Sequence, residues 1–484
     1  MDNLVPELLE HIASFLDSST LDCFSRSSTN CRAASMRCLM NTISISFDSP
    51  EQFSASLNKT IDMLEATEGH KYVRHLRVHA THSLEVDRWY NTDHNDVWRQ
   101  RHEDRCLVSS AYRWQEPRLL DLSSPWPALC KVVKSLLALR ELTWATPEQI
   151  PLDILTHLHT LGRPRLHMLM FDLASLCCRD GRPPHLSTQE LELARSPYLR
   201  SIDHVSDLYW YDDYKQDALL EIVAAGALRN LCIRNTGPPR YPVRDTQAAN
   251  KSFDPWQAGI IRSTDSLGAL DTLMLIGIQT DTTLKNLSLR TDFSVLKSLS
   301  LYGQVPMSTF SWLSELDLPL DHLIIGMQKY LVSVAIITSF TSLTSLRLDN
   351  KYDVDSLYEI LRHFSERLRA LHCKSKFIDL DMLAVLSQFC PRIEQLGFCM
   401  VRNADSAAEF AIYHSIGRLV AVKQVELHFR PHQVPPETIS QNYYRTIDLK
   451  KEKQLVSSIV RAIGSSKPQY AIPLEEVRLN AIAR

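Results

Sequence analysis

Leu270-Asp271-Thr272-Leu273-Met274-Leu275 carries the pattern that decides the fold, with apolar residues at its first, fourth and sixth positions. The pattern returns with starts at residues 296, 320, 343, 368, 393 and 422, so the steps are 26, 24, 23, 25, 25 and 29 residues. Further copies start at residues 73, 139, 166, 228 and 474. Such regular steps indicate one structural unit used many times rather than several unrelated domains.

Each copy is followed by a spacer with helical periodicity. In residues 353–364, for example, Leu357, Ile360, Leu361 and Phe364 share one helical face. Both the step length and the strand-then-helix order resemble leucine-rich repeats, whose period is about 20–29 residues. Neighbouring strands lie about 4.8 Å apart, whereas packed helices need about 8–10 Å. We therefore expect a curved α/β solenoid, with parallel strands on its concave face and helices on its convex face.

The repeats are irregular. The Asn or Cys that this repeat type usually carries after its third apolar position is mostly absent, and residues such as Gln304 and Lys376 stand there instead. Proline-rich segments near residues 236–259 and 428–446 interrupt the period and are interpreted as insertions. The expected organisation is a helical module at 1–47, a linker or capping region at 48–130, and the repeats at 131–484.

The N-terminal segment predicts three short helices. Residues 4–16 read Leu-Val-Pro-Glu-Leu-Leu-Glu-His-Ile-Ala-Ser-Phe-Leu, in which Pro6 suits the first helical turn and the apolar residues make one broad face. A second helix follows near Leu21 and Phe24, and a third runs from about Cys31. Three such helices in about 45 residues bury too little surface to be stable alone. Their apolar faces therefore require the rest of the chain or another protein.

This segment resembles the F-box. The matching positions are Leu4, Pro6, Glu7, Leu8, Leu9, Ile12, Leu16, Leu21, Phe24 and Arg32. It departs from the motif in the extra residue Val5, in serines at Ser27 and Ser28 where valine is usual, and in Ala34 where an aromatic residue is usual. The resemblance implies binding to the adaptor of a cullin–RING (SCF-type) ubiquitin ligase. The implied adaptor-binding residues are Leu4, Pro6, Leu8, Leu9, Ile12, Leu16 and Leu21.

The expected function is therefore that of a substrate-recognition subunit, which holds a target protein on its repeats. Side chains alternate across a strand, so those between the helix-facing leucines point into the concavity. These candidate target-binding residues are Met274, Ser300, Arg347, Asp349, His372 and Lys374. The aromatic run Tyr209–Tyr214 is either a recognition loop or part of the core. Two alternatives stay open: a ligase-independent interaction scaffold on the same solenoid, and an enzyme with its active site in an insertion.

Composition argues against several other classes of protein. The net charge of −3 shows no basic bias, so we expect no nucleic-acid partner. The 11 cysteines form no Cys-x-x-Cys pair and suit a reducing compartment. The start has no secretory signal and no apolar run is long enough to span a membrane, so we expect no membrane association and a cytoplasmic or nuclear location, or both.

The sequence contains none of the common catalytic or phosphate-binding motifs. The chain has no phosphate-binding glycine loop, no Gly-x-Ser-x-Gly elbow and no His-Glu-x-x-His helix. His157, His159 and His167 lack an acidic or cysteine partner at metal-ligand spacing, so they are interpreted as surface residues. Asp379 and Asp381 are interpreted as a helix cap rather than a metal-binding pair. We expect no catalytic residue, no metal and no cofactor.

Overall fold

The structure is a computed structural model, and the chain divides into two compact units. The first unit comprises residues 1–270 and 289–291, and the second comprises residues 271–288 and 292–484. The structure describes residues 4–47, 49–80, 126–146, 148–171, 173–176, 186–206, 215–235, 267–277, 281–326, 328, 330–349, 352–377, 379–401, 407–430 and 449–481. Each unit is described by itself.

The first unit begins with three short helices, α1 (Pro6–Phe15), α2 (Ser18–Ser25) and α3 (Thr29–Leu39). The carboxylate of Asp17 caps α2 by accepting a hydrogen bond of 2.8 Å from the backbone N–H of Thr20. The hydroxyl of Ser28 caps α3 in the same way, at 3.1 Å from the N–H of Cys31. Both short helices therefore begin where a side chain satisfies free backbone donors.

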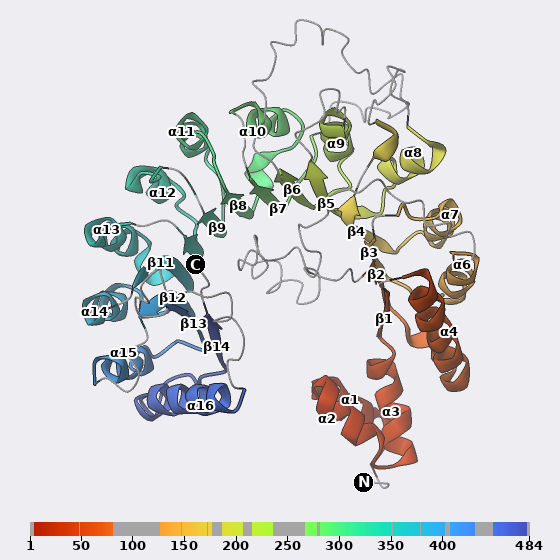
Figure 1. Ribbon diagram of the computed structural model, residues 1–484, viewed down its shortest axis with the longest axis horizontal. Helices are drawn as coiled ribbons and strands as arrows, with labels where there is room; N and C mark the ends of the chain where they lie inside the picture. The colour runs from red at the N-terminus through yellow and green to blue at the C-terminus, as the bar shows by residue number, and fades with distance from the viewer. Residues whose placement is uncertain are drawn as a thin grey trace, which may run out of the picture. The chain divides into compact units, whose positions relative to one another are not determined.

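Strands and helices then alternate in the first unit (Figure 1). Each strand pairs in parallel with the next, in the order β1 (Thr42–Phe47), β2 (His75–Ala80), β3 (Glu141–Ala145), β4 (Arg165–Phe171), β5 (Leu199–Ser206) and β6 (Asn230–Asn235). The helices of this part are α4 (Pro50–Thr67), α6 (Trp126–Ser135), α7 (Leu152–Leu161), α8 (Thr188–Ala194) and α9 (Lys215–Ala224).

Strands and helices also alternate in the second unit. Its strands, again all parallel, are β7 (Thr272–Ile276), β8 (Ser298–Tyr302), β9 (His322–Gly326), β10 (Ser345–Leu348), β11 (Ala370–Phe377), β12 (Gln395–Val401), β13 (Gln424–Arg430) and β14 (Glu476–Ala481). Its helices are α10 (Asp281–Ser288), α11 (Met307–Glu315), α12 (Val334–Ser339), α13 (Val354–Phe364), α14 (Leu380–Phe389), α15 (Ala407–Gly417) and α16 (Leu449–Ser465).

The core of each unit lies between its strands and its helices. In the second unit the repeating leucines Leu273, Leu299 and Leu323 align in register and are buried. The helices supply the opposite side of this core, as Leu357, Ile360 and other apolar residues of α13 do. Side chains between the leucines point to the other face of the sheet, which we call the inner face.

Glycines occupy the turn after two successive strands. Gly277 and Gly303 both have positive φ, at 94° and 104°. The N–H of Gly277 donates to the carbonyl of Tyr302 at 2.8 Å, and the N–H of Gly303 donates to that of Gly326 at 2.9 Å. A Cβ on Gly303 would lie 2.2 Å from the carbonyl oxygen of Gly277. Backbone hydrogen bonds therefore join these turns, where the usual Asn of the repeat is missing.

The predicted fold class is confirmed: in the described ranges, N-terminal helices precede fourteen parallel strands that alternate with helices, as in a leucine-rich-repeat solenoid. The sheet begins with β1, well before the expected boundary at residue 131, because α4 and β2 already form a repeat-like unit. Of the two expected insertions, residues 236–259 lie outside the described residues, and so does 431–446 of the other. In the described part of the chain, no helix is long and apolar enough to cross a membrane.

Candidate functional site

The outer side of α1 carries an unusual row of exposed apolar side chains. Leu8, Ile12 and Phe15 follow at intervals of four and three residues, which places them on one helical face, and the exposed Leu4 precedes the helix. Leu8 is 50% exposed and Phe15 is 75% exposed. We call these four residues the α1 stripe. Apolar side chains grouped in this way are typical of interaction sites.

The opposite side of α1 packs inside the helical trio. Leu9, only 1% exposed, forms a small core with Cys31 and Ala34 of α3, and Phe24 of α2 packs against it. Because these contacts hold α1 by its inner side, the α1 stripe stays exposed. The three helices therefore bury the apolar side chains on one side of α1 but leave those of the α1 stripe exposed.

The structure divides the predicted adaptor-binding residues into two groups. Leu4, Pro6, Leu8 and Ile12 are exposed, and Leu16 is half-buried. Leu9 and Leu21 are buried, so in this fold they support the trio and do not offer surface to a partner. Phe15 was part of the predicted apolar face but not among the predicted adaptor-binding residues, although it is the most exposed member of the stripe.

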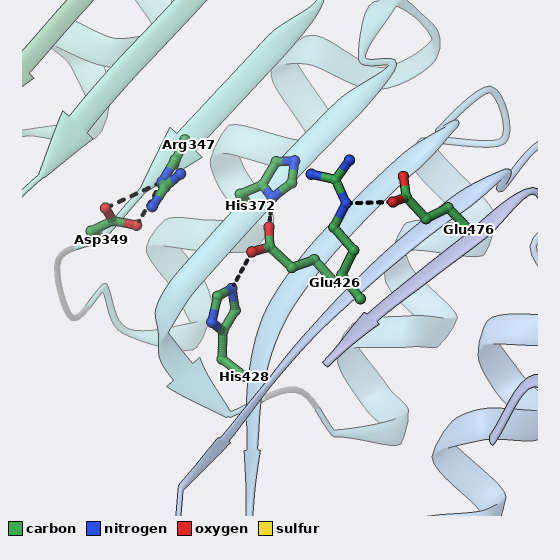
Figure 2. A network of polar contacts seen from close by, with 7 residues as sticks. Arg347, Asp349, His372, Glu426, His428 and Glu476 are labelled. Atoms are coloured by element: carbon green, nitrogen blue, oxygen red, sulfur yellow. Dashed lines mark hydrogen bonds and ion pairs between the residues drawn. The ribbon is translucent and has the colours of Figure 1, made fainter. Parts of the chain in front are cut away.

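A second candidate site is a polar network on the inner face of the second unit (Figure 2). The register sets Met274, Ser300, Ile324, Arg347, His372, Gly397, Glu426 and Arg478 in one row across the strands. Two residues further along the strands lies a second row, which includes Tyr302, Gly326 and His428. Asp349, directly after β10, continues that second row.

Gly397 makes one half of this network possible. His372 on β11 reaches past β12 to Glu426 on β13, with 3.3 Å between Nδ1 and Oε2. A Cβ on Gly397 would lie 2.2 Å from that same Nδ1, so any other residue would obstruct the ring. His428, which is fully buried, approaches the other carboxylate oxygen of Glu426 at 3.0 Å. One buried carboxylate is thus held between two imidazoles.

Gly326 has the same role in the other half. The Nε of Arg347 lies 3.2 Å from both carboxylate oxygens of Asp349. Its guanidinium also lies over the ring of Tyr302, 5.9 Å from the ring centroid. A Cβ on Gly326 would lie 2.4 Å from the Tyr302 ring. Side chains from β8 and β10 therefore meet above the intervening strand.

Arg347 carries the fixed positive charge of the network. Burial lowers the pKa of Arg347, but Tyr302, Asp349 and Glu426 outweigh burial and raise the pKa above its ordinary value. The guanidinium is therefore charged under all ordinary conditions. Because Arg347, Glu426 and His428 are buried, the network offers a partner only the partly exposed side chains of Asp349 and His372.

The predicted target-binding residues fall into this network only in part. Arg347, Asp349 and His372 belong to it, although Arg347 is buried and the other two are half-buried. Met274 and Ser300 share the row but are buried. Lys374 lies in β11, and its side chain is outside the described residues, as is the run Tyr209–Tyr214. Tyr302, Glu426, His428 and the two glycines were missed, because only the register brings them together.

In the ranges that the structure describes, no group of three or more His, Cys, Asp or Glu side chains could hold a metal ion. The interpretation of His167 as a surface residue is wrong, because this side chain is buried and hydrogen-bonds to the hydroxyl of Ser201 at 2.8 Å. His159 hydrogen-bonds to the hydroxyl of Ser196 at 2.8 Å. Asp379 caps α14 at 2.8 Å from the N–H of Met382, so its predicted role as a cap is confirmed.

No protein-family model matches the chain. A search of the curated proteins also finds no match.

Proposed function

We propose that the chain is the substrate-recognition subunit of a cullin–RING (SCF-type) ubiquitin ligase. The α1 stripe would bind the adaptor of the ligase, and the repeats would bind a target protein. The observation that supports this most directly is the exposure of Leu8, Ile12 and Phe15 on a helix whose other side is already packed. This arrangement precedes a strand–helix solenoid, whose long sheet suits protein recognition.

The α1 stripe is apolar and large enough to form the centre of a protein–protein interface. Burying an exposed leucine, isoleucine or phenylalanine contributes about 1.5–3 kcal/mol each. A few such anchors usually carry most of the binding energy of a standard interface of about 1,600 Å². Within the proposal, Leu8, Ile12 and Phe15 are the central anchors, with Leu4 and Pro6 beside them. Leu9 and Leu21 act indirectly, because they hold α1 in place.

The chain itself would catalyse nothing. Binding at both ends raises the effective concentration of the target near the ubiquitin-transfer machinery, and this positioning accelerates transfer. Asp349 and His372, the partly exposed members of the inner-face network, would supply polar contacts to a target. Such a subunit would work in the cytoplasm, in the nucleus or in both.

Co-purification and proximity labelling from cells test the proposal. The test variant is Leu8→Asp with Ile12→Asp, because both side chains are exposed and their replacement leaves the trio's core intact. The matched control is Val354→Asp with Leu380→Asp, two apolar side chains of similar exposure on α13 and α14. We expect the test variant alone to lose the adaptor and cullin while keeping its other neighbours. Wild-type protein that never recovers the adaptor would instead favour a ligase-independent scaffold.

A further inference from the structure

Arginines follow one another along one edge of the sheet in the first unit. At this edge, the backbone N–H of a residue at or just before the start of one strand donates to the carbonyl of the corresponding residue on the neighbouring strand. There the N–H of Arg140 donates to the carbonyl of Arg74 at 2.8 Å, and that of Arg165 donates to Arg140 at 2.6 Å. Between β4 and β5 the arginines are not joined, because there the N–H of Leu166 donates to Tyr198 at 2.8 Å; between β5 and β6 the N–H of Arg229 donates to Arg200 at 2.9 Å. We call these five arginines the arginine row.

The second unit has the same backbone ladder but a different choice of side chains. Its members, each bonded to the one before, are Asp271, Lys297, Asp321, Thr344, Arg369, Glu394, Lys423 and Glu475. Charges of opposite sign alternate along much of this ladder and form ion pairs. Glu394 lies 2.7 Å from Lys423 and 3.6 Å from Arg369. The fold is therefore compatible with a row of side chains whose charges balance at this edge of the sheet.

The arginine row lacks such a balance. Neighbouring strands lie about 4.8 Å apart, a distance at which like charges repel and destabilise the sheet. Burial lowers the pKa of Arg200, and the nearby Arg229 and Arg165 lower it further. In the described part of the first unit, none of the five forms an ion pair with a carboxylate. The row is a concentrated positive charge at the sheet edge.

Backbone contacts explain the position of two members without neutralising them. A guanidinium nitrogen of Arg200 donates to the carbonyl of Ala227 at 2.8 Å, and one of Arg229 donates to that of Ala269 at 2.7 Å. Each guanidinium has five N–H donors, so most remain for another acceptor. Arg140 and Arg165 are exposed.

We propose that the arginine row binds an extended, carboxylate-rich segment of a target protein. This inference rests on the proposed role of the chain as a target receptor, and names the kind of target segment. Five members at the starts of β2 to β6 span about 19 Å, which is the length of about six residues of extended chain. Guanidinium groups bind carboxylates through paired hydrogen bonds.

The test uses the full chain and a fluorescent peptide of about eight glutamates, followed by fluorescence anisotropy. The variant is Arg140→Gln with Arg165→Gln, two exposed side chains with no hydrogen-bonded partner in the described structure of this unit. The matched control is Lys297→Gln with Arg369→Gln on the ladder of the second unit. The peptide should bind the wild type and the control alike. It should bind the Arg140→Gln, Arg165→Gln variant on the order of tenfold more weakly, because each exposed ion pair contributes up to about 1 kcal/mol.

Two further measurements make the result specific. The melting temperature of the Arg140→Gln, Arg165→Gln variant should stay level or rise, since repulsion is relieved. Adaptor co-purification should be unchanged, which separates a failure of this inference from a failure of the proposed function. The inference is overturned if a glutamine peptide of equal length binds as well. It is also overturned if the control loses as much affinity, or if oligothymidylate competes as strongly as the glutamate peptide.

Discussion

Replacing Gly397 with alanine tests whether the inner-face network is held together by the space that this glycine leaves. The new Cβ would lie 2.2 Å from Nδ1 of His372, far inside the ordinary contact distance. The imidazole can rotate away, but it then gives up its approach of 3.3 Å to Glu426. Gly397→Ala should therefore break one half of the network without unfolding the strand.

The expected cost follows from two opposing terms. Losing a partner of a largely buried carboxylate costs about 1–3 kcal/mol, whereas alanine in place of glycine within a strand stabilises by about 0.5–1 kcal/mol. Urea denaturation should show a net loss of about 1–2 kcal/mol for Gly397→Ala. In a His372→Ala background the clash is gone, so the same replacement should be neutral or stabilising.

Gly326→Ala is the matched comparison. Its Cβ would lie 2.4 Å from the buried ring of Tyr302, which has less room to rotate than His372. It should therefore cost more than Gly397→Ala, and His372→Ala should not relieve it. An equal cost of Gly397→Ala with and without the His372 ring would refute the reasoning, because the glycine would then matter for its backbone alone.

Three further predictions concern single side chains. Leu9→Ala should destabilise the trio by about 2–5 kcal/mol, whereas Leu8→Ala should change stability by less than about 0.5 kcal/mol, as thermal melting of both would show. Burial raises the pKa of Cys390 to about 12, so iodoacetamide should label exposed Cys23 in the folded protein and spare Cys390 until denaturant is added; early labelling of Cys390 would contradict its burial. Burial and the charge of Lys134 lower the pKa of His157 below its ordinary 6.5. The unfolded chain then takes up a proton more readily, so stability should fall as the pH drops below about 6.5, and His157→Gln should flatten that fall in urea titrations at several pH values.

The repeat architecture could be predicted from the sequence because apolar spacing reports burial directly. The run that begins at Leu296 leads into β8, and the apolar positions of residues 353–364 became the buried face of α13. Asp379 could be assigned as a cap because a short acidic side chain before an apolar helix has few other local roles.

The division within α1 could not be predicted. Leu8 and Leu9 both belong to one broad apolar face, and only the position of α3 decides that Leu9 is buried and Leu8 is not. The inner-face network depends on register for the same reason. Gly397 and Glu426 are far apart in the sequence and become neighbours of His372 only when three strands align.

The arginine row is hidden in the sequence by uneven loops. Its members are separated by intervals that range from 25 residues, between Arg140 and Arg165, to 66, between Arg74 and Arg140. No local pattern joins them, because the edge of the sheet is defined only after the strands pair.

The most direct test of the account is a calorimetric titration of the purified full chain with the adaptor of a cullin–RING ligase. The wild type should bind with a Kd at or below about 1 μM, and Leu8→Asp with Ile12→Asp should weaken binding at least about a hundredfold at an unchanged melting temperature. A wild-type chain that gives no heat of binding, or a variant that binds as tightly as the wild type, would contradict the claim that the α1 stripe is an adaptor-binding surface.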